Sequence, residues 1–421
     1  MIGFFLTWII LLLIGMPITF TIIIASLIYM LQHGGIMLAA QRIVAGVDSF
    51  TLLAVPFFIF SGNLMNATGI TDRIFKFAKT MVGHISGGLG HVNILASLLF
   101  SGMSGSAHAD AGGLGQIEIQ AMREEGYDDG FSGAITAASS VVGPLMPPSI
   151  PMVIYGAIAS VSVGKLFMGG IIPAILCAFS LMVYVYFYSK KQNYKIYKKA
   201  SASERWHAFI EAFPALVTPV IIIAGIFSGV FTPTEAAAVT SLYALILGIF
   251  VYKSFSIRKM RQIFKDTLSN TAVIGFLTAA ISLMGYVLAR EQIPQKIASF
   301  FLTYTANPLL FLLSVNVLLI ILGTMIETMA IILLVIPILV PVAMQLGIDP
   351  VHFGVVVTMN MMVGILTPPM GVSLFVVSKV GNIPFERLSK SIIPFFIPLF
   401  FVLFLLMIFP DIVMFLPNLM D

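Results

Sequence analysis

The chain is poor in charged residues and in cysteine. Charged residues make up 10% of its 421 residues and hydrophobic residues 59%, whereas about 25% of a soluble globular domain is charged. So little charge cannot cover the surface of a soluble protein of this length, which excludes a soluble enzyme. The single cysteine, Cys177, lies in an apolar stretch and can form no internal disulfide, so we interpret it as a packing residue.

Signatures of several other protein classes are missing. No G-x-x-x-x-G-K-[ST] run is present, so the chain itself is not predicted to use ATP. No H-E-x-x-H run is present, and His108 and Asp110 lack a third ligand at a usable spacing, so no zinc site is expected. The net charge of +4 comes from basic residues in loops, which does not suggest nucleic acid. Neither a catalytic constellation nor a continuous polar stripe is found, which disfavours an intramembrane enzyme and a channel.

Long apolar runs fill most of the chain. A helix needs about 20 apolar residues to cross a hydrocarbon core of about 30 Å, and stretches such as 169–188 and 391–409 meet that need. The first run starts at Ile2 without the basic segment of a cleaved signal peptide, so we expect it to remain in the membrane. The sequence predicts an all-α, multi-pass integral membrane protein whose surroundings are a lipid bilayer.

Basic residues indicate how the chain crosses the membrane. The two densest basic loops, 189–207 and 253–265, are separated by two apolar segments, so both can lie on the cytoplasmic side. Extending this scheme leaves all but four basic residues inside. The exceptions are Arg42, Lys165, Arg290 and Lys296. The scheme also predicts that both termini lie outside.

The sequence repeats itself weakly at a constant offset along the chain. The matches fall on helix-breaking residues, and VGPLMPPS at 142–149 lies over VGILTPPM at 363–370 without a gap. The matched pairs are Gly102 with Gly323, Gly133 with Gly354, Gly143 with Gly364, and Pro147-Pro148 with Pro368-Pro369. We therefore predict two repeats, at 1–200 and 208–421.

Each repeat contains two interrupted segments. We predict re-entrant hairpins at 86–125 and 305–347, because each begins and ends on one side of the membrane in the scheme above. Broken helices at 130–160 and 351–378 follow, since two consecutive prolines must interrupt a helix. The two hairpins start from opposite sides, and inverted repeats with broken helices are typical of secondary transporters.

The interruptions are the predicted ion sites. Non-helical backbone survives within a membrane only where it lines a cavity or binds something, and freed carbonyls with hydroxyls suit Na⁺. The predicted ligands are Ser104, Ser106 and Gly143 for a first site, and Gly323, Thr324, Gly364 and Thr367 for a second. The alternative is that these hydroxyls bond to their own helices or allow close packing.

Few carboxylates fall inside the predicted membrane region, where a charge is costly and usually functional. Asp110 and Glu327 are our candidates for substrate binding, together with Ser149 and Arg290. Arg290 could equally anchor its helix at the interface. We interpret Glu118 as a residue at the hairpin mouth. Glu235, after Thr232 and Pro233, is typical of a helix start.

The strings GVFTPTEAAAV at 229–239, SGSAHAD at 104–110 and GPLMPPS at 143–149 resemble the large membrane subunit of TRAP (tripartite ATP-independent periplasmic) transporters. The likeness covers essentially the whole chain. It implies Na⁺-driven import of an organic anion, of the sialic acid or C4-dicarboxylate class, across a bacterial inner membrane. It also implies a small four-helix membrane subunit, a periplasmic substrate-binding protein and an elevator mechanism.

Two further expectations concern the mechanism. A related alternative is a stand-alone Na⁺/dicarboxylate symporter that needs no binding protein. In an elevator, the hairpins and broken helices move as one body against a scaffold. We expect the segments without breaks, chiefly 169–188 and 391–409, to form that scaffold, with 212–252 joining the halves.

Overall fold

The computed structural model describes residues 2–192, 194, 196–254, 256–304 and 307–420. Residues 193 and 195 of the first basic loop, 255 of the second, and 305–306 of the second predicted hairpin lie outside it. The described residues form helices and turns and contain no strand, which confirms the all-α prediction.

The helices of the first half are α1 (Ile2–Leu13), α2 (Ile18–His33), α3 (Ala39–Val47), α4 (Ala54–Ala67), α5 (Ile70–Val82), α6 (Gly88–Ser104), α7 (Ala107–Gly113), α8 (Gly115–Glu124), α9 (Asp129–Ser140), α10 (Ile150–Ala159) and α11 (Val163–Gln192). Those of the second half are α12 (Ala202–Phe227), α13 (Pro233–Ile246), α14 (Ile257–Arg290), α15 (Ile293–Tyr304), α16 (Pro308–Gly323), α17 (Thr328–Gln345), α18 (Pro350–Gly364), α19 (Val372–Gly381), α20 (Phe385–Ser391), α21 (Phe396–Ile408) and α22 (Asp411–Met414).

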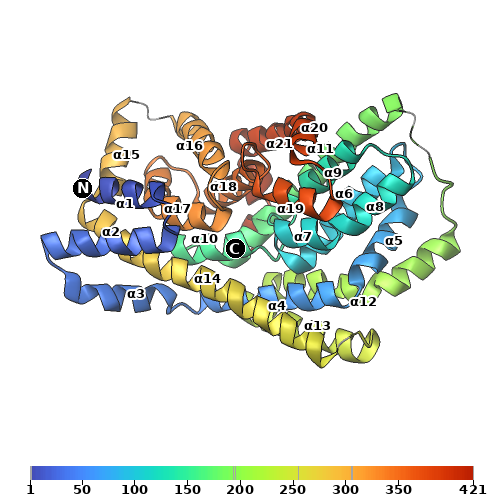
Figure 1. Cartoon of the computed structure of the whole chain (residues 1–421), viewed down its shortest axis with the longest axis horizontal. Helices are drawn as coiled ribbons and strands as arrows, with labels where there is room; N and C mark the ends of the chain where they lie inside the picture. Colours follow the sequence, from blue (N-terminus) through green and yellow to red (C-terminus); the bar gives the residue numbers. More distant parts are fainter. Residues whose placement is uncertain (1, 193, 195, 255, 305–306, 421) are drawn as a thin grey trace.

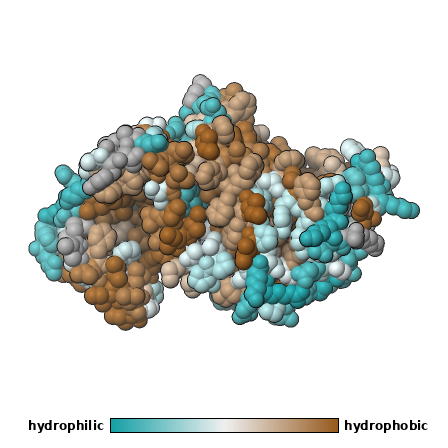
Figure 2. Space-filling model, turned by 90° about the horizontal axis from the view of Figure 1, so that it is seen from above, coloured by the Kyte–Doolittle hydropathy of each residue, from teal (hydrophilic) through white to brown (hydrophobic). Residues whose placement is uncertain are grey.

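Several of these helices can cross a membrane. Within the described ranges, six are long and apolar enough, and a seventh span results if the pair Ile36–Val47 and Thr51–Ala67, bent by 54°, counts as one. Figure 2 shows hydrophilic residues gathered toward both ends of the long axis and mostly hydrophobic residues between them. This distribution fits a bilayer around the middle of the molecule.

The helices pack in two groups. In one group, α14 lies along α2, α3 and α4, while α13 packs on α4 and α12. The other group contains α6 to α11 and α16 to α21, which pack on one another (Figure 1). Helix α5 contacts α12 in the first group and α6 in the second, and α17 of the second group packs against α14 of the first. These contacts join the two groups.

The interruptions fall at matching positions in the two halves. The first lies between α6 and α7, where Gly105 has a φ of +62° that favours glycine. Helix α7 begins at Ala107 and α17 at Thr328, while α8 ends at Glu124 and α17 at Gln345. The two helix starts are separated by the same offset that relates Gly102 to Gly323 in the sequence, and so are the two helix ends.

The two Pro-Pro motifs also interrupt helices, as predicted. Helix α9 ends at Ser140 and α10 begins at Ile150, while α18 ends at Gly364 and α19 begins at Val372. The Pro147-Pro148 and Pro368-Pro369 bonds are both cis.

The segments without breaks pack on the interrupted helices. Helices α11 and α21 pack on each other and on α18, and α11 also packs on α6 and α10. Small residues allow this, because a Cβ on Gly170 would overlap the carbonyl oxygen of Leu145 in the first break. The segments 169–188 and 391–409 therefore lie among the interrupted helices and support the breaks. The segment 212–252 does lie in the other group.

The close approach at Gly170 predicts a stability effect. Gly170→Ala should lower the free energy of unfolding by about 1–3 kcal/mol, because the added methyl group overlaps a backbone oxygen that cannot easily move. Thermal unfolding in detergent measures this. Gly275→Ala is the matched control, since nothing lies within 4 Å of its Cβ position, and it should be neutral or stabilising. Equal unfolding temperatures for both variants would contradict the packing argument.

Candidate functional site

The first hairpin tip consists of Ser104, Gly105 and Ser106. The Ser104 hydroxyl donates a hydrogen bond of 2.5 Å to Asp110 Oδ1. Ser106 is the N-cap of α7, and its Oγ accepts a bond of 3.4 Å from the backbone N–H of Ala109. The backbone N–H of Ser106 also points to Ser104 Oγ at 3.5 Å. The sequence therefore folds this tip around its own hydroxyls and one carboxylate.

This tip meets the first Pro-Pro break. A Cβ on Gly143 would lie 2.7 Å from Asp110 Oδ2, so the carboxylate lies directly against the break. The Gly105 carbonyl accepts a bond of 3.4 Å from the N–H of Ile150. Asp110 is 1% exposed, and its Oδ2 has no hydrogen-bond partner among the described residues. A buried carboxylate oxygen in this state can accept a cation or a donor from a ligand.

Ser149 belongs to the same break. Its hydroxyl donates to the carbonyl of Pro144 and accepts a bond of 3.3 Å from the N–H of Met152, so it caps α10. The side chain is fully buried. Ser104, Ser106, Asp110, Gly143 and Ser149, chosen from the sequence, thus come together at one tip and one break.

In the second tip, Glu327 is the N-cap of α17. Its Oε2 accepts bonds from the N–H groups of Met329, at 2.8 Å, and Ala330, at 3.3 Å. A negative charge is stabilised at this end of a helix. Glu327 is the counterpart of Ser106 at the offset of the repeat, so the two tips use the same position as a cap with different side chains.

The second tip lies against the second break. A Cβ on Gly323 would be 2.9 Å from the Cα of Gly364, which brings the two backbones into direct contact. The Thr324 hydroxyl donates to the Ile321 carbonyl at 2.8 Å, and the Thr367 hydroxyl donates to that of Val363 at 2.9 Å. Both hydroxyl protons go to the local backbone, which leaves oxygen lone pairs available to a cation.

Each hairpin also packs on the opposite repeat. Helix α7 contacts α19, with His108 Nδ1 3.4 Å from Ser373 Oγ, and α17 contacts α10. Each hairpin therefore touches the break of its own repeat and the half-helix that follows the break of the other. These contacts between the two halves were not predicted from the sequence, because no residue pattern indicates them.

The structure does not bring Arg290 to the tips. Its guanidinium donates two bonds of 2.6 Å, to the carbonyls of Gly34 and His33 at the end of α2. The neighbouring Glu291 accepts a bond from the Tyr29 hydroxyl. Of the two roles the sequence left open for Arg290, these contacts favour anchoring.

Two other carboxylates can now be placed. Glu235 forms a capping box with Thr232, which confirms the predicted helix start. Glu118 does not lie at an open hairpin mouth: it is 1% exposed, so that interpretation was wrong. The reason is that α8 packs against both α9 and α19, which cover the hairpin on two sides.

Buried amides join each hairpin to its broken helix. In the first repeat, Asn93 donates to Thr136 at 2.7 Å and accepts from Ser139 at 2.8 Å. In the second repeat, Asn360 donates to Asn316 Oδ1 at 2.5 Å. Polar pairs of this kind hold membrane helices together. The signal in the sequence was a single amide in each of the apolar runs 88–104, 308–323 and 350–364.

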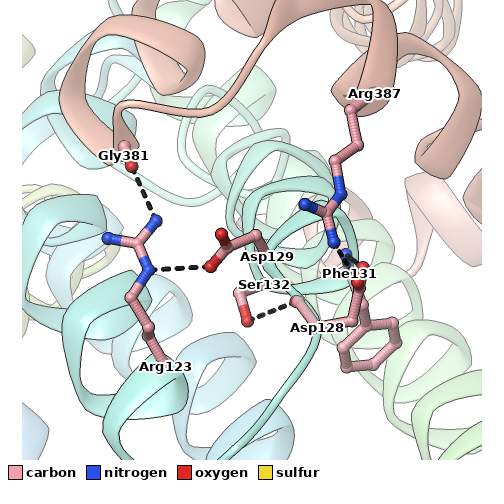
Figure 3. A network of polar contacts seen from close by, with 7 residues as sticks. All are labelled: Arg123, Asp128, Asp129, Phe131, Ser132, Gly381 and Arg387. Carbon is pink, nitrogen blue, oxygen red and sulfur yellow. Dashed lines mark hydrogen bonds and ion pairs between the residues drawn. The ribbon is translucent and has the colours of Figure 1, made fainter.

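A polar network lies where α8, α9 and α20 meet (Figure 3). Arg123 donates to Asp129 at 2.7 Å and to the carbonyl of Gly381 at 2.9 Å. Asp128, the N-cap of α9, accepts from the N–H of Phe131 at 2.9 Å and pairs with Arg387. These contacts tie the end of the first hairpin to the second repeat.

Two cavities of the described residues lie away from the tips. One of about 400 Å³ is lined by Pro308, His352 and Met407, among others. Another of about 290 Å³ lies between the two helix groups, lined by Ser49 and Ser282 on one side and Ile158 and Leu333 on the other. We place the candidate site at the tips because the polar groups converge there.

An all-helical, multi-pass membrane fold with interrupted helices and a buried carboxylate beside them defines a membrane transporter. The chain belongs to the family described as "Tripartite ATP-independent periplasmic transporter, DctM component", whose model matches residues 5–412. It is therefore a transporter of organic anions in the bacterial inner membrane, and not an enzyme.

Relatives cover the whole chain. It is 54% identical over 421 residues to the sialic acid TRAP transporter large permease protein SiaM of Vibrio cholerae, covering 100% of this chain and 99% of that one. It is 48% identical to the sialic acid TRAP transporter permease protein SiaT of Haemophilus influenzae, covering 99% of this chain and 68% of that one. The C4-dicarboxylate TRAP transporter large permease protein DctM of Pseudomonas aeruginosa is 39% identical to this chain, and the match covers 88% of this chain and 87% of that one.

Two solved structures share the fold. The YdaH transporter of Alcanivorax borkumensis matches with a TM-score of 0.62 and 13% identity, covering 89% of this chain and 87% of that one. MtrF of Neisseria gonorrhoeae matches with a TM-score of 0.63 and 12% identity, covering 90% of this chain and 83% of that one. At this identity, the likeness concerns the fold alone.

The Asp128 contacts predict an acid-sensitive stability. Partial burial would raise the pKa of Asp128, but the Phe131 amide and the Arg387 guanidinium outweigh it and lower the pKa. This stabilisation is therefore present above the ordinary pKa of about 4 and is lost as pH falls through the lower, folded value. Asp128→Ala should cost about 1 kcal/mol at neutral pH and less in acid.

Thermal unfolding across pH tests this, with Asp128→Asn as the matched variant. Asparagine keeps the helix cap but loses the ion pair, whose exposed position limits its contribution to about 1 kcal/mol or less. A destabilisation by Asp128→Ala that is constant down to acid pH would contradict an electrostatic origin.

Proposed function

We propose that this chain is the Na⁺-coupled membrane subunit of a sialic acid importer. The observation that carries this proposal is that each hairpin tip contacts the Pro-Pro break of its own repeat, with Gly143 on Asp110 in one and Gly323 on Gly364 in the other. Carbonyls, hydroxyls and a carboxylate converge there, and such hard oxygen ligands suit Na⁺. Sialic acid is favoured over C4-dicarboxylates because the relatives named for it share 54% and 48% identity, against 39%.

The two repeats are proposed to have inverted orientations. In Figure 1, α6 and α8 enter from the end that carries the basic loop after α11, and α15 to α17 enter from the other end. The helix bounds and caps that match at the offset of the repeat support this assignment. Sites at opposed half-helices near the middle of the membrane are typical of secondary transporters. Substrate would lie between the tips, near Asp110, Ser149 and Glu327.

Transport is proposed to follow an elevator mechanism with two partners. The hairpins, broken helices, α11 and α21 form the moving body, and α2, α3, α4 and α12 to α14 form the scaffold. A small four-helix membrane subunit would dock on that scaffold, and a periplasmic protein would deliver the substrate. Uptake into proteoliposomes with and without the binding protein tests this. Uptake without it would favour a stand-alone Na⁺/dicarboxylate symporter.

Two Na⁺ sites predict cooperative coupling. Uptake should have a Hill coefficient for Na⁺ above one and should fail in K⁺. Ser106→Ala and Thr324→Ala should each raise the Na⁺ requirement roughly 5–10-fold, because each removes one oxygen ligand worth on the order of 1 kcal/mol. Ser314→Ala is the control, since its hydroxyl is exposed on α16 and bonds to the Leu310 carbonyl. Unchanged Na⁺ titrations in both tip variants would favour a packing role for these hydroxyls.

Movement between the two helix groups can be tested by cross-linking. Ile158 on α10 and Ser282 on α14 line one cavity, so cysteines there, in a Cys177→Ala background, should be cross-linked in one state. This should stop uptake, because it ties the moving body to the scaffold. The control pair is Ser49→Cys with Ser282→Cys, which line the same cavity but lie on the scaffold side. Full uptake by the cross-linked Ile158 pair would refute the elevator mechanism.

A further inference from the structure

Glu118 is a buried acid that the proposed transport sites do not use. It lies on α8, the returning arm of the first hairpin, and its side chain is 1% exposed. Neither Oε1 nor Oε2 has a hydrogen-bond partner among the described residues. Buried polar atoms are nearly always paired, so two unpaired oxygens on one carboxyl group need an explanation.

The helices around Glu118 pack closely. A Cβ on Gly115, one turn earlier, would lie 2.9 Å from the methyl group of Thr136 on α9. The Ile119 side chain approaches Gly381 on α19, where an added Cβ would lie 2.9 Å from it. Leu114 and Met122, one turn away on either side, are fully buried. This packing removes Glu118 from bulk water.

Among the residues that the structure describes, no basic group offsets a charge on Glu118. The titratable side chains on the helices that pack on α8 are His91, His108, Asp110, Asp129 and Lys379. Of these, Asp110 acts electrostatically on Glu118, and the effect is unfavourable because both groups are acids. His91 bonds to the Ser86 carbonyl, and Asp129 is paired with Arg123. His108 lies beside Ser373, and Lys379 is exposed.

The nearby polar side chains of the described ranges do not build a metal site around Glu118. Asn93, Ser97, Thr136 and Ser139 bond to one another, with Ser97 donating to Ser139 at 3.0 Å. A hard cation requires several oxygen ligands around it. Such oxygens gather at the tip, around Asp110, and not around Glu118.

We propose that Glu118 is a proton-binding site in the first hairpin. A proton from water at the hairpin's cytoplasmic end forms an O–H bond on one carboxylate oxygen as the hairpin packs against α9 and α19. Protonation at neutral pH costs less than burying an unpaired carboxylate beside another acid. The neutral acid then remains buried while the hairpin is closed. This inference does not depend on Na⁺ coupling or on the identity of the substrate.

Infrared difference spectroscopy of the purified protein tests the proposal without measuring transport. The wild-type chain should show the C=O stretch of a protonated carboxylic acid at neutral pH, and the band should shift in D₂O. Glu118→Gln should abolish that band, because glutamine copies the shape of the neutral acid but lacks the group. Glu124→Gln, an exposed residue of the same helix, should keep it, and so should Asp110→Asn. A band that survives Glu118→Gln, or none in the wild type, would overturn the proposal.

A second measurement covers the case in which Glu118→Gln folds poorly. If the folded state holds a proton that the unfolded state has released, stability must fall as pH rises. The wild-type unfolding temperature should therefore decrease from about pH 6 to about pH 9, and Glu118→Ala and Glu118→Gln should flatten this dependence relative to Glu124→Gln. The same slope in all four proteins would show that Glu118 holds no proton.

Discussion

Backbone polar groups cannot remain unpaired in hydrocarbon, and the architecture of this transporter depends on that constraint. The helix ends at the two tips and at the two Pro-Pro breaks expose such groups. The chain covers them by packing each tip on the break of its own repeat. Glycines at the contacts bring the backbones together, as Gly323 and Gly364 show. The same contacts that make the interruptions tolerable also concentrate the oxygen atoms of the candidate ion sites.

The two halves of the chain resemble each other in their helices but differ in their chemistry. Helix bounds and caps coincide at one offset, yet the first tip is capped by Ser106 and the second by Glu327. The first repeat buries two acids and a chain of hydroxyls, while the second joins its hairpin and broken helix through the amides of Asn316 and Asn360. One backbone plan therefore carries two different polar interiors, which allows the halves to bind different ligands.

Local features were predictable from the sequence, and long-range packing was not. The breaks, the tip residues and the start of α13 at Pro233 each follow from residue types that act within a few positions. Other features depend on residues far away in the chain. They are the contact of each hairpin with a half-helix of the other half, the anchoring of Arg290 and the burial of Glu118. The neighbours of α11 could not be predicted for the same reason. A helix without breaks gives no local sign of what it packs on, and its small residues, such as Gly170, suit more than one neighbour.

The packing of α7 on α19 has a consequence for biogenesis. Ala107 opens the first of these helices and Val372 the second, so most of the chain is synthesised between them. At about 5–20 residues per second, the first hairpin must wait on the order of tens of seconds for its partner. During that interval the tip can already pack on the break of its own half, but the side of α7 that carries His108 lacks its partner Ser373. The packing of α7 is therefore completed only near the end of translation, and a chain truncated before α19 leaves that side of α7 without its partner.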